Sequence, residues 1–182
     1  STGASGSQRT EYMWFPGAKC SGTNATTIWD TVAVASNPGL AACVAGTNIH
    51  KWVMDFANDV SRSIQTGFRL PDDWVSTVDA KFKWSSSVTT GDVVWQLATV
   101  CVADSETDDQ AFNTASVVTD TAKGTANQLN DASITGVDVT GCAAGEFLHL
   151  KLFRDPAHAS DTHTGTARLQ GLELTIRRSG GI

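Results

Sequence analysis

The stretch STVDAKFKW, residues 76–84, decides the fold class because apolar and polar side chains alternate along it. One face carries Val78, Ala80, Phe82 and Trp84. The other face carries Asp79, Lys81 and Lys83. A repeat of two residues is that of a β-strand with one buried and one solvated face. The stretch therefore predicts a half-buried strand of an antiparallel sheet.

The same repeat recurs on both sides of this stretch. It occurs in IHKWVMDF (49–56), FLHLKLFRD (147–155) and ARLQGLELTIRR (167–178), while VVWQLATVCVA (93–103) is apolar on both faces and suits a central strand. ASVVTDT (115–121) and NQLNDASI (127–134) suit short exposed strands. About eight strands, several joined by long loops and almost without helical periodicity, predict an all-β fold, a single antiparallel β-sandwich of jelly-roll type.

The domain boundary falls near residue 45. Residues 46–182 are predicted to form the sandwich, whereas residues 1–45 suit an irregular, extended N-terminal arm packing on the domain or on a neighbouring subunit. A chain of 182 residues is long enough for one domain with a sizeable core.

Charge and hydropathy exclude two classes of partner. The formal net charge is -6, and no run of Lys or Arg offers a surface for phosphates, so nucleic acid is excluded. No window approaches the roughly 18 to 20 apolar residues of a membrane span, so a membrane is excluded as well.

The four cysteines lack the paired C-x-x-C spacing of a zinc site or a redox motif. Four cysteines allow three disulfide connectivities. We expect the sequence-local pairing, Cys20 with Cys43 and Cys101 with Cys142, because each partner lies in or beside a loop-rich segment. The alternative is four unbridged cysteines that act as small hydrophobic residues.

A loop rich in polar residues, RDPAHASDTHTG (154–165), follows a predicted strand. The Asp and His residues could bind a metal ion, and a Ca²⁺ site shared with the acidic stretch DSETDDQ (104–110) is a further alternative. No nucleophile pairs with the histidines by spacing, which disfavours a catalytic base. The favoured interpretation is a structural loop without cofactor, containing Arg154, Asp155, Asp161, Thr162 and Gly165.

In this interpretation Arg154 binds Asp155, Asp161 or another nearby carboxylate, and Asp161 also caps backbone amides. Arg154 shares the face of the strand's leucines, and its loss is expected to cost about 1 to 3 kcal/mol. His158 and His163 are expected to be exposed, with losses under about 0.5 kcal/mol each.

Six tryptophans are the other unusual feature. Trp52, Trp84 and Trp95 lie at strand spacings that direct them to a core or to a cover over it. An interface or a glycan could instead use aromatic residues of the arm and loops, namely Tyr12, Trp14, Phe15, Trp29 and Trp74.

Several stretches together resemble a group of uncharacterised proteins encoded by bacteriophage and metagenomic genomes. They are FRLPDDW, VDAKFKW, SSVTTGDVVWQLATVCVAD, TDTAKGTANQLNDASI and GEFLHLKLFRDPAHASDTHTGTARLQGLEL, in that order over about residues 50–177. Such proteins look like virion- or tail-associated jelly rolls, and the resemblance brings no catalytic motif. It implies a structural role for the matching residues Pro71, Trp84, Gly91, Trp95, Arg154, Asp155, Asp161, Thr162, Gly165 and Gly171.

These observations favour a non-enzymatic virion structural protein, a tail, fibre or capsid-surface subunit that acts by self-association and surface attachment. Its partners would be copies of itself and other virion proteins, and its location would be the virion or the extracellular space. The alternative is a carbohydrate-binding module that uses loop tryptophans to bind a glycan. A third class, a cupin-like or hydrolytic enzyme, lacks a recognisable motif.

Overall fold

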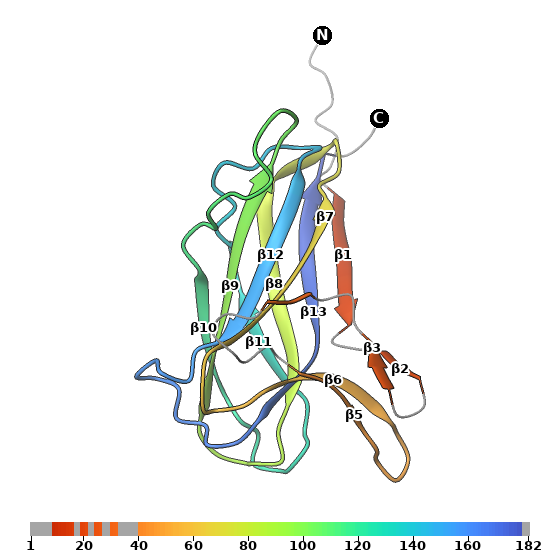
Figure 1. The fold of residues 1–182 in the computed structure, drawn as a ribbon, viewed down its shortest axis with the longest axis vertical. Helices are drawn as coiled ribbons and strands as arrows, with labels where there is room; N and C mark the ends of the chain where they lie inside the picture. Colours follow the sequence, from red (N-terminus) through yellow and green to blue (C-terminus); the bar gives the residue numbers. More distant parts are fainter. Residues whose placement is uncertain (1–8, 17–18, 22–23, 27–29, 33–39, 180–182) are drawn as a thin grey trace.

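The structure, a computed structural model, describes residues 9–16, 19–21, 24–26, 30–32 and 40–179. Every regular element in these ranges is a β-strand. No helix in the described part is long and apolar enough to cross a membrane. Two antiparallel sheets pack face to face, so the predicted all-β sandwich is confirmed (Figure 1).

The first sheet has six strands. In spatial order it contains β11 (Asn130–Ile134), β8 (Trp74–Ser85), β13 (Ala167–Arg178), β6 (Lys51–Phe56) and β5 (Leu40–Val44), and β1 (Arg9–Pro16) also pairs with β13. The second sheet contains β10 (Ser116–Thr121), β9 (Asp92–Val102), β12 (Phe147–Arg154), β7 (Arg62–Arg69) and β4 (Asp30–Val32). A separate two-stranded sheet joins β2 (Lys19–Ser21) to β3 (Asn24–Thr26).

The eight strands from β6 to β13 follow jelly-roll order. The first sheet takes the first, eighth, third and sixth of them, and the second sheet takes the second, seventh, fourth and fifth. Consecutive strands therefore alternate between the sheets except from β9 to β10, which are neighbours in the second sheet. This order places the loops 57–61, 86–91, 122–129 and 155–166 together at one end of the sandwich.

The segment 1–45, predicted to be an irregular arm, contains regular strands. Residues 9–16 pair with β13 over the whole length of β1, and residues 40–44 pair with β6. These two ranges are therefore regular strands of the first sheet, and the expected irregularity is wrong for them. The cluster of strand-favouring aromatic residues, Tyr12, Trp14 and Phe15, is the sequence signal that indicates the first of these strands.

The core fills the space between the sheets with the residues that alternation predicted. Along β12 the buried positions are Leu148, Leu150, Leu152 and Arg154, which share one face. Trp95 lies at the centre of an aromatic cluster, with the Phe82 ring stacked on it at a centroid distance of 5.5 Å and the Phe56 ring against it at 5.1 Å.

Trp52 departs from this pattern. Alternation in IHKWVMDF placed it with Met54 and Phe56, which are buried, yet 48% of its surface is exposed. The reason is that β6 pairs with β13 only over Ala167–Leu169, so that Trp52 lies beyond the paired region. The prediction that Trp52 joins the core is therefore wrong.

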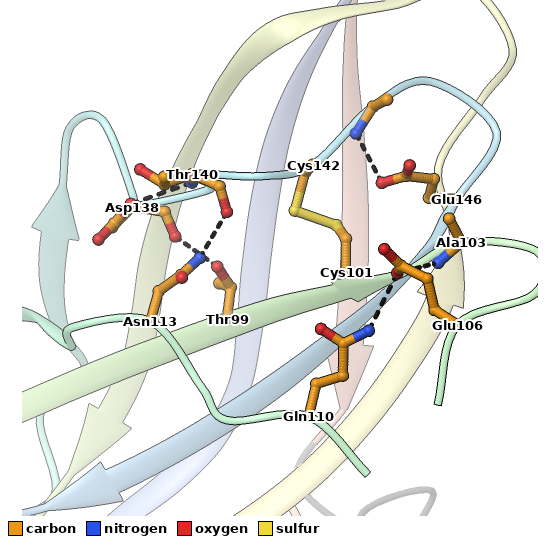
Figure 2. The surroundings of a disulfide bond; sticks show 11 residues. Thr99, Cys101, Ala103, Glu106, Gln110, Asn113, Asp138, Thr140, Cys142 and Glu146 are labelled. Atoms are coloured by element: carbon orange, nitrogen blue, oxygen red, sulfur yellow. Dashed lines mark hydrogen bonds between the residues drawn. A yellow bond between two sulfur atoms is a disulfide. The ribbon is translucent and has the colours of Figure 1, made fainter. Parts of the chain in front are cut away.

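A disulfide closes the opposite end of the sandwich from the Arg154 loop. Cys101, near the end of β9, is bonded to Cys142 in the loop before β12, which confirms this predicted pair. Figure 2 shows the loop contacts beside it, including the Glu106 carboxylate, which accepts hydrogen bonds from the Ala103 N–H and the Gln110 amide. Cys43 is also disulfide-bonded, whereas the side chain of its predicted partner Cys20 lies outside the described residues.

Candidate functional site

Arg154 occupies the end of β12 and is fully buried. All five of its N–H donors have protein acceptors. Nε and Nη2 donate to the two carboxylate oxygens of Asp161 at 2.9 and 2.7 Å, and Nη2 also donates to the His163 carbonyl at 2.5 Å. Nη1 donates to the carbonyls of Phe56 and Gly165 at 3.1 and 2.8 Å. Phe56 ends β6 in the first sheet, whereas Arg154 ends β12 in the second. The Arg154 side chain therefore joins both sheets to the loop 155–166.

The loop 155–166 is also bonded to the start of β9. Asp161, whose side chain is 2% exposed, accepts a hydrogen bond from the Val94 N–H at 3.0 Å in addition to its pair with Arg154. The Thr162 hydroxyl accepts from the Asp92 N–H at 2.9 Å. Asp155 binds the Gln96 amide instead of Arg154. Of the carboxylates proposed for Arg154, the structure brings Asp161 to it and leaves Asp155 apart.

His163 is buried, contrary to the prediction that it is exposed, and 2% of its surface remains accessible. Its Nδ1 lies 2.8 Å from the Thr90 carbonyl and its Nε2 lies 2.9 Å from the Ser86 hydroxyl. Burial lowers the pKa of His163, so the ring is neutral and donates through Nδ1 to the carbonyl. Its partners lie 73 and 77 positions away in sequence, which is why spacing did not indicate them.

The contact between Ser86 and His163 has the composition of a nucleophile and its base, but it is closed to substrate. Ser86 is 4% exposed, and the Trp84 ring packs edge-on against the imidazole. A Cβ on Gly165 would lie 2.6 Å from Val88 Cγ2, so the loop covers the pair tightly. By contrast His158 is exposed, as predicted, and its Nδ1 accepts from the Ser160 N–H.

The alternative of a shared Ca²⁺ site is contradicted by the positions of the two loops. The Arg154 loop adjoins the start of β9 at Asp92, whereas residues 104–110 follow its end at Val102. Eleven residues of strand separate these loops by roughly 30 Å. Within the described ranges no group of three or more His, Cys, Asp or Glu residues could hold a metal ion.

The aromatic residues proposed for an interface or a glycan separate into two groups. Phe15 and Trp74 are each 7% exposed, and Phe15 packs against Phe68, so both belong to the core and their proposed surface role is wrong. Trp29 lies outside the described residues. Tyr12 and Trp14, on the outer face of β1, are 68% and 51% exposed.

Trp14 and Trp52 both line a fork between β1 and β6. Both strands pair with the same edge of β13: the pairing of β1 ends at Gly171, and that of β6 begins at Leu169. The register of β13 shifts between these two residues, as in a β-bulge. The fork contains a pocket of about 260 Å³ lined by Trp14, Ile49, His50, Lys51, Trp52 and Gln170.

Gly171 fixes the position of the Trp14 ring. A Cβ at this glycine would lie 2.4 Å from Trp14 Cζ2, so only a residue without a side chain lets the indole lie against the backbone of β13. The resemblance implied a structural role for Gly171. In the structure this glycine lies against the Trp14 ring, which lines the pocket.

The pocket combines aromatic surface with hydrogen-bonding groups. His50 is exposed, Lys51 has no ion pair among the described residues, and the Gln170 amide donates to the Ser85 hydroxyl at 3.3 Å. Two half-exposed indoles can pack on the apolar face of a small ring, while an imidazole, an ammonium group and an amide can bind its polar edge. The sequence indicated Trp14 but missed Ile49, His50, Lys51 and Gln170, whose proximity depends on the divergence of the strands.

Comparison of the sequence with protein-family models and with curated proteins finds no match. Solved structures with a similar fold include a carbohydrate-binding module specific for non-crystalline cellulose, 7% identical, with a TM-score of 0.44 over 85% of this chain and 89% of that one. A family 11 carbohydrate-binding module from Clostridium thermocellum is 12% identical, with a TM-score of 0.43 over 91% and 87%. The infectious bursal disease virus Gx strain structure is 10% identical, with a TM-score of 0.39 over 100% of this chain and 54% of that one.

Proposed function

We propose that this chain is a non-catalytic carbohydrate-binding module whose ligand occupies the fork between β1 and β6. The observation that carries the proposal is the exposure of Trp14 and Trp52, at 51% and 48%, in one pocket. Trp84, Trp95 and Trp74 show that the core of this domain has room for tryptophans. Two large aromatic side chains left half-exposed at one place mark a binding surface.

A sugar suits this pocket because its ring has an apolar face and a polar edge. An indole can cover the apolar face, and the side chains of His50, Lys51 and Gln170 can donate hydrogen bonds to hydroxyl groups. A purely apolar ligand would leave these polar groups unpaired, which lowers affinity.

The composition of the pocket supports binding without hydrolysis. Glycoside hydrolysis requires two carboxyl groups on either side of the scissile bond. The six described residues that line the pocket include no Asp or Glu. The enclosed pair of Ser86 and His163 offers no accessible nucleophile in its place.

The disulfides support a location outside the reducing cytosol. Cys101 is bonded to Cys142, and Cys43 is disulfide-bonded as well. Structural disulfides persist in extracellular spaces and on virion surfaces. Both locations give access to glycans.

A second candidate is the virion subunit that acts by self-association. It is favoured by the exposed pair Tyr12 and Trp14 on β1, which could pack against a copy of the chain. The two candidates differ in oligomeric state. Sedimentation at rising concentration should show a monomer if Trp14 serves a glycan, whereas an oligomer that dissociates in Trp14→Ala would favour the subunit.

The test of the proposed function is binding to a panel of neutral and acidic polysaccharides, measured by affinity electrophoresis. Trp14→Ala and Trp52→Ala should each weaken binding at least about tenfold, because each removes one stacking surface. Phe147→Ala is the matched control, since Phe147 is an aromatic side chain 43% exposed on the other sheet. Absence of binding by the wild-type protein, or equal loss in the control, would contradict the proposal.

A further inference from the structure

A second hollow lies on the outer face of the first sheet. It has a volume of about 380 Å³ and is lined by residues of β1, β13 and β8 and by residues in and just after β11. We call it the groove. Its side chains are mostly polar and include Tyr12, Lys81, Ser133, Glu173, Thr175 and Arg177.

The groove and the fork pocket meet at one pair of residues. Trp14, which lines the pocket, lies directly opposite Glu173, which lines the groove. The same row continues across the sheet from Glu173 to Lys81 and then to Ser133. Neighbouring strands are about 4.8 Å apart, so the row extends roughly 14 Å from Trp14.

Tyr12 carries the aromatic surface from the fork into the groove. It lies two residues before Trp14 on β1, and both side chains point to the outer face, roughly 7 Å apart along the strand. At 68% exposed it is the most exposed large aromatic residue in the described part of the chain. Its phenol ring can stack on a ligand, and its hydroxyl can bond to one.

The charges in the groove are paired with one another. Arg177 lies 3.4 Å from the Asp79 carboxylate, and Lys81 lies 3.8 Å from the Glu173 carboxylate. Two cations and two anions cancel, so the groove offers many donors and acceptors without an excess of either charge. The whole chain carries a formal net charge of -6, which disfavours a polyanion further.

From this arrangement we infer the class of ligand: a linear, uncharged polysaccharide whose chain continues from the fork pocket into the groove. Sugar units stack on Trp52 and Trp14 in the pocket and on Tyr12 at the junction. The following units exchange hydrogen bonds with the paired polar side chains of the groove. This inference rests on the proposed function, because it extends the same site.

The experiment is titration calorimetry with cello-, manno- and xylo-oligosaccharides from disaccharide to hexasaccharide, and with uronic acid oligomers of the same lengths as the charged comparison. For the series that binds, affinity should rise at least about tenfold from disaccharide to hexasaccharide. Tyr12→Ala and Ser133→Ile, both at exposed positions in the groove, should abolish this gain in affinity with length. Raising the salt concentration should leave the gain in affinity with length unchanged, since the charges of the groove cancel one another.

The outcomes separate this inference from the proposed function. If the disaccharide binds as tightly as the hexasaccharide, or if Tyr12→Ala and Ser133→Ile keep the gain with length, the groove is not part of the site while the fork remains one. Salt-sensitive binding restricted to uronic acid oligomers would overturn the uncharged ligand class. If no oligosaccharide binds and Trp14→Ala changes nothing, both proposals fail.

Discussion

The loop after Arg154 and the fork beside Trp14 use their side chains in opposite ways. In the loop, all five donors of Arg154 are bonded to protein, and His163 is enclosed. At the fork, two tryptophans are half-exposed, and Lys51 has no ion pair among the described residues. A satisfied polar network has no capacity left for a ligand, whereas an open aromatic surface has. The conspicuous polar motif therefore stabilises the fold, and the less conspicuous aromatic residues form the candidate site.

The comparison is tested most strongly by Arg154→Ala. The change leaves the Asp161 carboxylate buried without its cation, so we expect a loss of about 3 to 5 kcal/mol of unfolding free energy. This exceeds the loss expected from the sequence, because the pair is fully buried. Urea melts measure it, with the partly exposed Arg177→Ala as the control. Arg154→Lys should recover only part of the loss, since an ammonium cannot make two parallel bonds. A loss in Arg154→Ala no larger than the control's would contradict the loop's structural role.

Removing the disulfide between Cys101 and Cys142 should have the next largest effect. The bond joins residues 41 positions apart, and its loss in the double Ser variant should lower the unfolding free energy by about 2 to 4 kcal/mol. Comparison of urea melts with those of the wild type measures the change. Glycan binding should persist below the melting temperature, because neither Cys101 nor Cys142 lines the fork pocket. An unchanged melt would show that the native loop already holds its position without the bond.

His163→Ala should cost about 1 to 3 kcal/mol, because it strands the Thr90 carbonyl and the Ser86 hydroxyl. The wild type should also lose stability as the pH falls below about 6.5. There the unfolded His163 gains a proton that the folded ring, with its lowered pKa, does not. The variant should lack this component of the pH dependence. His158→Ala is the exposed control, with an effect under about 0.5 kcal/mol. Equal losses of unfolding free energy in the two histidine variants would contradict the distinction between a buried, bonded His163 and an exposed His158.

Trp52→Ala should have the smallest effect on stability, within about 0.5 kcal/mol, because its ring is half-exposed and outside the core. The same variant should lose most of its glycan affinity. Urea melts measure the change in unfolding free energy of this variant, and affinity electrophoresis measures its loss of glycan affinity. A large loss of stability would mean that Trp52 covers the core, as its alternation with Met54 had indicated.

The sequence predicts much of the fold because alternation along a strand is a local property. The buried face of β12, ending in Arg154, follows directly from FLHLKLFRD, and the chemistry of Arg154 predicts a carboxylate partner. What the sequence misses depends on distant segments. His163 is buried by residues more than 70 positions away, and Trp52 is exposed because β6 leaves β13. Local spacing along the sequence indicates neither the burial of His163 nor the exposure of Trp52.

The most direct test of the central claim is an NMR titration of the six indole N–H signals with cello-, manno- and xylohexaose. We expect a hexasaccharide to shift the signals of Trp14 and Trp52 and the amides around Gln170, and to leave those of Trp84, Trp95 and residues 155–165 unchanged. Shifts confined to residues 155–165, with Trp14 and Trp52 unmoved, would place the ligand at the Arg154 loop and contradict the assignment of the site.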